Sequence, residues 1–415
     1  MYMPHTMHHS AMHHPHWHAH QHLALLKILL VLLMMLIAWE AAGQAPVALT
    51  QDDLFSDTQL QEIRLTMNPA DWQAFKDNYT KDDYYKASLS WRGITVDEIG
   101  VRQRGTASRS GVKPYIGIDF KRYRSAQRFL GLTGLRLKNM IQDGSLMHER
   151  LSMMLFRRMN IAAPREGYGR VYMNDDYIGL YIIIEEIDAN FLQNSFGDGG
   201  GFLLEYVRLD DWHLEYLGAD PELYVPARFD VKTRKSEFNA ATIVEMIDVI
   251  NHAPDEEFAA SVSRYLDMSN VLRYVAVENY LAEWDGFLGH GGMNNYYFYQ
   301  TDAHSPFRMV AWDKEQGFGI PDHPVFYNAE LNVLMRRSLE NAELREYYLN
   351  ALRRITLEAG GYDGWLLGLA EQFYSQIWAA VLEDPQKLTS NADFESGMLQ
   401  IRSNIPQRYA YLMGE

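Results

Sequence analysis

Hydrophobic and polar residues alternate between residues 84 and 140, as they do in strands that bury one face. Two such runs, Tyr84–Trp91 and Ile94–Arg104, flank Arg92-Gly93, a pair typical of a tight hairpin turn. A third run, Tyr115–Lys121, alternates in the same way. We therefore expect a mainly antiparallel sheet in this part of the chain.

The pattern changes to helical spacing further along the chain. A second hairpin is predicted across Asn174-Asp175. From Glu237 onward apolar residues recur every three to four positions, and strand patterns return only at Asn295–Gln300 and Phe307–Trp312. Four helical stretches follow, near 329–339, 342–358, 362–383 and 393–412. Strands early and helices late favour an α+β fold with a helical C-terminal part and a cleft between two lobes.

Three helix starts carry capping residues. Asn68-Pro69 places a capping side chain before a proline in the first helical position, and this helix is predicted to run to about Asn78. Ser145 is predicted to cap a second helix, and Asp188 a short one that ends near Gln193.

The N-terminal residues have the composition of a leader. Residues 1–22 hold nine of the fifteen His without a nearby carboxylate or Cys, so we interpret them as a disordered tail and not as a metal site. Leu23–Trp39 is apolar except for Lys27, and its uninterrupted stretch, Ile28–Ala38, fits a signal sequence better than a membrane span of about 20 residues. We expect an exported protein that is cleaved after Gly43, or one tethered to the membrane by residues 23–39.

These patterns divide the chain into four parts. We expect a leader over residues 1–45, an N-terminal extension over 46–83, a core over 84–328 and a C-terminal helical region over 329–415.

Composition removes several classes of function. The net charge of −16 argues against a nucleic-acid-binding protein, because phosphate neutralisation needs a basic surface. A local group of Arg and Lys side chains still permits a phosphate ligand. The absence of Cys excludes disulfides, zinc–thiolate sites and thiol nucleophiles.

Acidic and amide residues recur at the ends of two aromatic strands. Asp285 precedes a Gly-rich turn, Gly286–Gly292, and Asn295 begins the strand that follows. Asp313 ends the next strand. Carboxylate and amide oxygens suit Mg²⁺, and a carboxylate not spent on metal can orient or deprotonate a hydroxyl group. The alternative is that Asp285 begins a turn and Asp313 caps one.

A basic strand–loop–strand provides a second candidate site. Arg102 and Arg104 end a strand, Gly105–Gly111 forms a loop of small residues, and Lys113 enters the return strand. Free backbone N–H groups and these cations would suit the phosphates of a nucleotide. Lys138, on a later strand, is the rival candidate for the phosphate lysine. The alternative is an ordinary basic hairpin.

Carboxylates also follow the apolar run Tyr181–Ile184. Glu185 and Glu186 could face a nucleotide or a metal, whereas Asp188 more simply caps the next helix. The motifs of zinc hydrolases, serine esterases, P-loop proteins and H-R-D kinases are all missing.

In their order along the chain, these segments resemble the CotH family of spore-coat-type proteins with an atypical protein-kinase-like fold. The resemblance covers roughly residues 60–320. It is carried by Val101–Gly105 with Ser108, Lys113–Ile116, Asp143–Ser145, Val171–Asn174, Tyr177–Tyr181, Glu185–Asp188 with Phe191-Leu192, Trp284-Asp285, Asn295–Tyr297 and Trp312-Asp313.

The resemblance implies a two-lobed, protein-kinase-like architecture and a reaction. That reaction is phosphoryl transfer from ATP to a Ser or Thr of a protein substrate, assisted by Mg²⁺ or Mn²⁺. By motif, Asp285 matches the active-site Asp, Asp313 the metal Asp, and Asn295 the Asn before Tyr that assists the metal.

Further residues match the nucleotide side of the family's site. Glu185 matches the Glu of its E-x-x-D element, and Arg102, Arg104 and Lys113 match its basic strand–loop–strand. The family often shows W-D-x-D, and here the second acid is Glu315. Two other functions stay open: a catalytically weak surface or coat binding protein, and a metal-dependent phosphoesterase.

Overall fold

The computed structural model describes residues 27–32, 34 and 48–414, in two units, Met1–Thr50 and Gln51–Glu415. Of the predicted signal sequence or anchor at 23–39, only residues 27–32 and 34 are described, and they are helical. The rest of that segment and the His-rich tail lie outside the described residues. Within the part of the chain that is described, no helix is both long and apolar enough to cross a membrane.

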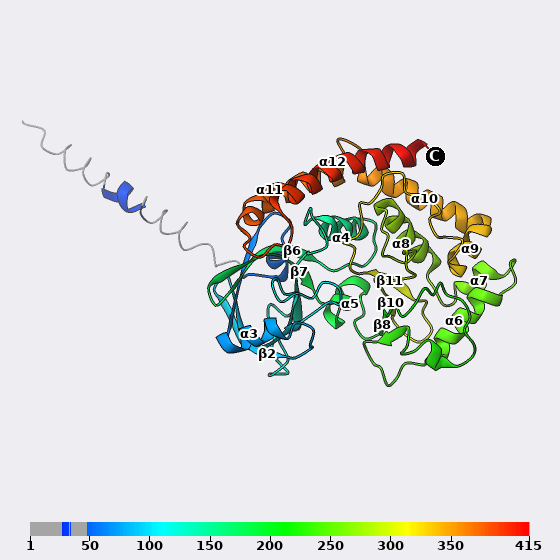
Figure 1. Cartoon of the computed structure of the whole chain (residues 1–415), viewed down its shortest axis with the longest axis horizontal. Helices are drawn as coiled ribbons and strands as arrows, with labels where there is room; N and C mark the ends of the chain where they lie inside the picture. The colour runs from blue at the N-terminus through cyan, green and yellow to red at the C-terminus, as the bar shows by residue number, and fades with distance from the viewer. Residues whose placement is uncertain (1–26, 33, 35–47, 415) are drawn as a thin grey trace, which may run out of the picture. The chain divides into compact units, whose positions relative to one another are not determined.

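Seven strands of the second unit close into a barrel (Figure 1). Its strand order is β1-β2-β3-β4-β5-β7-β6, and all neighbours are antiparallel except β1 and β6. The strands are β1 (Gln61–Met67), β2 (Tyr85–Trp91), β3 (Ile94–Gln103), β4 (Ile116–Asp119), β5 (Gly134–Lys138), β6 (Glu166–Met173) and β7 (Asp176–Glu185). The predicted antiparallel sheet is thus a closed barrel, and the segment expected as an extension, 46–83, supplies strand β1.

Both predicted hairpin turns are confirmed. Arg92 and Gly93 have φ of 47° and 81°, and Asn174 and Asp175 have φ of 51° and 71°. Positive φ at both central residues defines the type I′ turn, whose backbone twist matches that of the flanking strands. These turns set the registers of β2 with β3 and of β6 with β7.

A second, four-stranded antiparallel sheet has the order β11-β10-β8-β9. Its strands are β8 (Phe202–Tyr206), β9 (Phe229–Val231), β10 (Tyr296–Gln300) and β11 (Arg308–Ala311). Aromatic rings stack along it, with Tyr206 and Tyr296 5.0 Å apart between ring centroids. The sequence did not predict β9, which has only three residues.

Helices pack around both sheets and dominate the C-terminal half. They are α2 (Gln51–Leu54), α3 (Pro69–Asp77), α4 (His148–Arg158), α5 (Ala189–Phe196), α6 (Ala241–His252), α7 (Phe258–Val262), α8 (Met268–Leu281), α9 (Val333–Glu340), α10 (Ala342–Ala359), α11 (Trp365–Glu383) and α12 (Asn391–Gly414), with a short 3-10 turn at Pro221–Leu223. Almost every residue of α8 is buried. Helix α10 packs on α8, α11 packs on β7 and α4, and α12 packs on α10 and α11. The fold is therefore α+β.

Two of the three predicted caps are confirmed. The Asn68 side chain accepts a hydrogen bond from the first turn of α3, and the Asp188 side chain does the same for α5. The prediction for Ser145 is wrong, because α4 begins at His148 and the Asp143 carboxylate accepts from the His148 N–H at 2.8 Å.

Candidate active site

Asp285 and Asn295 contact each other directly. Asp285 lies just beyond the end of α8, and Asn295 immediately precedes β10 in a left-handed backbone conformation, φ 58°. The Asn295 side-chain amide donates to the Asp285 carbonyl oxygen at 3.0 Å and to its Oδ2 at 3.1 Å. The Asn294 amide also donates to Oδ2, at 3.1 Å. The two amides therefore fix the orientation of the Asp285 carboxylate.

The Gly-rich turn between these residues is closely packed. A Cβ atom on Gly286 would lie 2.6 Å from the Glu278 carboxylate, which accepts from the Phe287 N–H at 2.8 Å. Gly292 has φ 88°, and a Cβ there would lie 3.0 Å from the Asp210 carbonyl oxygen. Glycine thus allows the turn to approach α8 on one side and the segment after β8 on the other.

Asp313 lies in a cluster centred on a buried lysine. The Lys138 ammonium, at the end of β5, is 2.7 Å from Asp313 Oδ1 and 3.0 Å from Glu149 Oε2 in the first turn of α4. It is also 3.5 Å from Glu315 Oε2, so the Glu that replaces the second Asp of W-D-x-D reaches the lysine. Burial alone would lower the pKa of Lys138, but the surrounding carboxylates hold it well above its usual range.

Lys314 connects the Asp285–Asn295 pair with the cluster around Lys138. Its ammonium donates to the Asn295 carbonyl oxygen at 2.8 Å and pairs with Glu278 of α8 at 2.7 Å. Its backbone N–H donates to Glu149 Oε2 at 2.8 Å. Asp285, Asn295 and Asp313 thus belong to one network of contacts. Lys314 was not predicted as a site residue, although it directly follows Asp313.

Arginine side chains of the barrel lie beside this cluster. Arg136 and Lys138 are two residues apart on β5 and share a face of the strand. Arg136 makes two hydrogen bonds to Glu186, at 2.7 and 2.8 Å, and its guanidinium lies 4.3 Å from the centre of the Trp312 ring. Arg104 reaches Glu186 at 3.4 Å. The Glu186 carboxylate therefore connects Arg104, a predicted site residue, with Arg136 on the same strand as Lys138.

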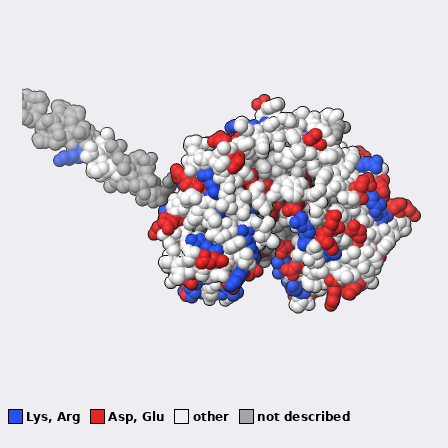
Figure 2. Space-filling view, viewed as in Figure 1, with Lys and Arg blue, Asp and Glu red and all other residues white. Residues whose placement is uncertain are grey.

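This arginine group makes one side of the site basic. Figure 2 shows the surface hollowed between the barrel and the part with the four-stranded sheet, with Lys and Arg side chains on both sides of the hollow. Burial alone would raise the pKa of Glu186, but Arg136 and Arg104 lower it to about 2. Arg102 lies 3.8 Å from Asp82 and over the ring of Tyr84, and its charge also lowers the pKa of Glu186.

The structure places Lys113 and Glu185 apart from the carboxylate cluster. The Lys113 ammonium is fully buried and pairs with Asp384, at the end of α11, at 2.7 Å. Glu185 pairs with Arg165 at 2.6 and 2.9 Å. Of the two lysines weighed for the phosphate role, the rival Lys138 is the one that contacts Asp313.

Two further residues at Asp285 were missed by the sequence analysis. Arg208, which follows β8, donates to Asp285 Oδ1 at 2.8 Å. Glu283 Oε1 accepts from the Asp285 N–H at 3.0 Å, and burial raises the pKa of Glu283 to about 8. The position of Glu283 two residues before Asp285 was a possible signal, whereas Arg208 lies 77 residues away and had none.

The donor atoms at Asp313 and Asn295 are suited to a metal that binds together with phosphate. Across the described residues, no group of three or more His, Asp or Glu side chains is arranged to hold a metal ion. Mg²⁺ needs only one or two protein carboxylates when phosphate and water oxygens complete its shell. The carboxylate of Asp313 and the amide oxygen of Asn295, whose amide nitrogen bonds to Asp285, are oxygen donors of this kind.

Comparison with known proteins assigns the chain to a family. The family model described as CotH kinase protein matches residues 101–412. A curated relative, the inner spore coat protein H of Bacillus subtilis (strain 168), is 24% identical over 367 residues, which cover 86% of this chain and 98% of the relative.

Two solved structures match more distantly. The proinflammatory kinase CtkA of Helicobacter pylori has a TM-score of 0.29 and 11% identity, covering 72% of this chain and 94% of CtkA. A complex of the toxin–antitoxin proteins HipA and HipB with operator DNA from Shewanella oneidensis MR-1 has a TM-score of 0.34 and 10% identity, covering 90% of this chain and 74% of the matched chain.

Proposed function

Because the chain belongs to the CotH kinase protein family, we propose that it transfers the terminal phosphoryl group of ATP to a Ser or Thr hydroxyl of a protein. The observation that carries this proposal is the contact of buried Lys138 with Glu149 of a helix and with Asp313. Protein kinases need an ion pair between a strand lysine and a helix glutamate, together with a metal-binding aspartate, to hold the nucleotide.

Each residue then has a separate task. Lys138, oriented by Glu149, binds phosphate oxygens of the nucleotide, and Arg104 and Arg136 add positive charge on the barrel side. Asp313 and Asn295 would hold Mg²⁺ or Mn²⁺, which when bound neutralises phosphate charge. Asp285 orients the acceptor hydroxyl and accepts its proton. In this proposal the barrel and the helical part form the two lobes around the nucleotide.

We also propose where the protein acts and on what. The apolar stretch within residues 23–39 supports export or a membrane tether, and the curated relative is described as an inner spore coat protein. The acceptor is a protein and not a nucleic acid, in keeping with the net charge of −16.

One observation favours the second candidate, a catalytically weak binding protein. Both carboxylate oxygens of Asp285 already have partners, Arg208 on Oδ1 and the Asn294 and Asn295 amides on Oδ2. These three donors use three of the about four lone-pair sites of the carboxylate, which leaves one site, on Oδ1, for a hydroxyl.

The test compares nucleotide binding with phosphoryl transfer in the full-length chain. The wild type, Asp285→Asn, Asp313→Asn and Lys138→Met are incubated with labelled ATP, Mg²⁺ or Mn²⁺ and a generic Ser/Thr protein acceptor. Lys121→Met, an exposed lysine after β4, is the matched control. Thermal shift with Mg·ATP measures binding.

We expect the three site variants to fail in different steps. Asp313→Asn and Lys138→Met should lose the nucleotide-induced shift, whereas Asp285→Asn should keep it and lower transfer by about 10²- to 10⁴-fold. Equal nucleotide affinity in Asp313→Asn and Asp285→Asn would contradict the assigned roles. A wild type that neither binds ATP nor transfers label would favour the binding protein. Release of phosphate from small esters without ATP would favour a phosphoesterase.

A further inference from the structure

Arg208 holds the oxygen of Asp285 that faces away from the two asparagines. Its Nη1 donates to Asp285 Oδ1 at 2.8 Å, and its side chain is 40% exposed. A Cβ atom on Gly291 would lie 3.7 Å from the same nitrogen, so the guanidinium also lies against the Gly-rich turn. Arg208 therefore lies at the candidate acceptor side of the site, at the surface.

The guanidinium has donors to spare. An arginine side chain carries five N–H donors in a planar fork, and among the described residues Arg208 spends one nitrogen, on Asp285. The neighbouring acids have partners of their own: Asp210 pairs with Arg228 at 2.6 Å, and Asp211 pairs with His213 at 2.8 Å. Asp210 uses both of its carboxylate oxygens on Arg228, and Asp211 uses one oxygen on His213.

We infer that Arg208 recognises an anionic group next to the acceptor hydroxyl, and that Asp285 holds the guanidinium in place until the acceptor arrives. This rests on the proposed function. An exposed ion pair contributes little net free energy, so the replacement of Asp285 by another anion at Arg208 should cost little free energy. A carboxylate or a phosphate group can then accept two parallel hydrogen bonds from the guanidinium, and Asp285 Oδ1 becomes available to the hydroxyl.

The experiment uses synthetic peptides and the full-length protein. Each peptide carries one Ser in a neutral background, flanked on both sides by Glu, phosphoserine, Lys or Ala. A parallel set replaces the acceptor Ser by Ala, so that binding is measured by calorimetry without phosphoryl transfer. The proteins are the wild type, Arg208→Glu and the control Arg402→Glu. Arg402 is also about equally exposed, 41%, and pairs with a single glutamate, Glu371, away from the site.

We expect the wild type and Arg402→Glu to favour the anionic peptides over the Lys peptide by about tenfold in kcat/KM, the size of one charge-assisted hydrogen bond. Arg208→Glu should reverse this order, and the change should appear in the KM for peptide and not in the KM for ATP. The Glu and phosphoserine arms show which anion is preferred.

Three results would overturn the inference. The first is an unchanged peptide preference in Arg208→Glu, and the second is a change confined to the KM for ATP. The third is equal calorimetric affinity of the wild type for the Glu, phosphoserine and Lys peptides that lack the acceptor Ser. If no peptide is phosphorylated, the proposed function fails, while a calorimetric preference for anionic peptides that is lost in Arg208→Glu would still support Arg208 as the anion-binding residue.

Discussion

Glu186 shows at the scale of one residue how neighbouring charges decide a protonation state. Its carboxylate accepts two hydrogen bonds from Arg136 and lies 3.4 Å from Arg104. Burial would raise its pKa, but these guanidinium groups lower the pKa to about 2 from the usual 4.5. A carboxylate whose pKa is lower in the folded state adds stability above the unfolded pKa and loses it in acid.

We predict that Glu186→Gln makes stability less dependent on pH in the acid range. The wild type should lose about 2 to 3 kcal/mol of unfolding free energy from this group as the pH falls from about 4.5 to about 2. In Glu186→Gln this loss should be absent, and near neutral pH the variant should be less stable because Arg136 loses its ionic partner. Urea unfolding across this pH range measures both effects. Glu371→Gln, at an exposed pair, is the control, and parallel curves for the wild type and Glu186→Gln would contradict the prediction.

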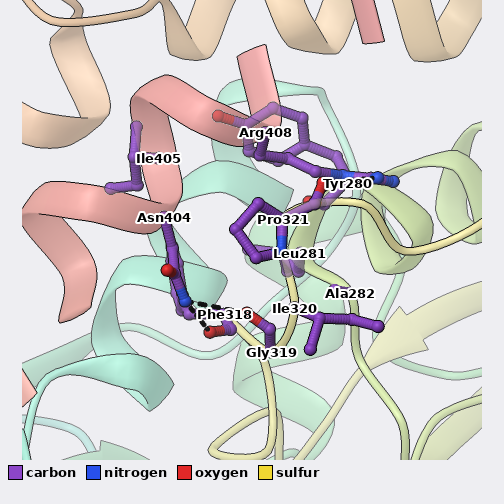
Figure 3. Close-up of a pocket in the computed structure, with 10 residues that line it drawn as sticks. All are labelled: Tyr280, Leu281, Ala282, Phe318, Gly319, Ile320, Pro321, Asn404, Ile405 and Arg408. Atoms are coloured by element: carbon purple, nitrogen blue, oxygen red, sulfur yellow. Dashed lines mark hydrogen bonds between the residues drawn. The ribbon is translucent and has the colours of Figure 1, made fainter. Parts of the chain in front are cut away.

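At the scale of elements, helix α12 holds the segment that follows Asp313. Asn404 donates to the carbonyl oxygens of Phe318 and Gly319, at 3.0 and 2.8 Å (Figure 3). Arg408, buried next to it, donates to the carbonyl of Pro321 at 3.1 Å and to that of Asn279, near the end of α8, at 2.8 Å. One helix thus connects the segment after Asp313 with the helix that leads to Asp285.

We predict that Arg408→Met loosens this region and leaves the barrel intact. The substitution leaves several buried carbonyl groups without a donor, which should cost about 3 kcal/mol or more. Hydrogen exchange should rise in residues 314–328 and 279–285. Arg402→Met, on the same helix in an exposed ion pair, is the control. An equal rise in hydrogen exchange in β2 and β3 would mean global destabilisation. It would contradict a local stabilising role of Arg408.

At the scale of the whole molecule, a buried ion pair joins residues 271 positions apart. Lys113 leads into β4 of the barrel, and Asp384 ends α11. The Asp384 carboxylate also accepts from the Leu180 N–H of β7 at 3.0 Å. Gly179 makes room for it, because a Cβ there would lie 2.5 Å from the carboxylate. The pair therefore attaches the C-terminal helices to the barrel.

We predict that Lys113→Met lowers stability without changing nucleotide affinity. Removal of one partner leaves a buried charge on Asp384, which should cost about 3 to 5 kcal/mol. The double variant Lys113→Met with Asp384→Asn should recover part of this loss, because the asparagine is neutral and still accepts from Leu180. Urea unfolding measures stability, and Mg·ATP titration measures affinity. Additive losses in the double variant, or a loss of ATP binding as large as that of Lys138→Met, would contradict this account.

The sequence by itself determined the features that depend on neighbouring residues. The hairpin turn at Arg92-Gly93, the caps at Asn68 and Asp188, and the order of motifs that places the chain in its family were all readable. The physical reason is that turn conformation and helix capping depend on residues within a few positions of each other. The strand that begins at Asn295 was predicted from the pattern of its own residues.

Only the tertiary structure decided which charged groups meet. Lys113 lies just before β4 and Lys138 ends β5, yet one pairs with Asp384 and the other with Asp313. Glu185 and Glu186 are adjacent, and one pairs with Arg165 while the other pairs with Arg136. Barrel closure and helix packing set these partners, because they bring together residues far apart in the chain, and no local pattern records that pairing.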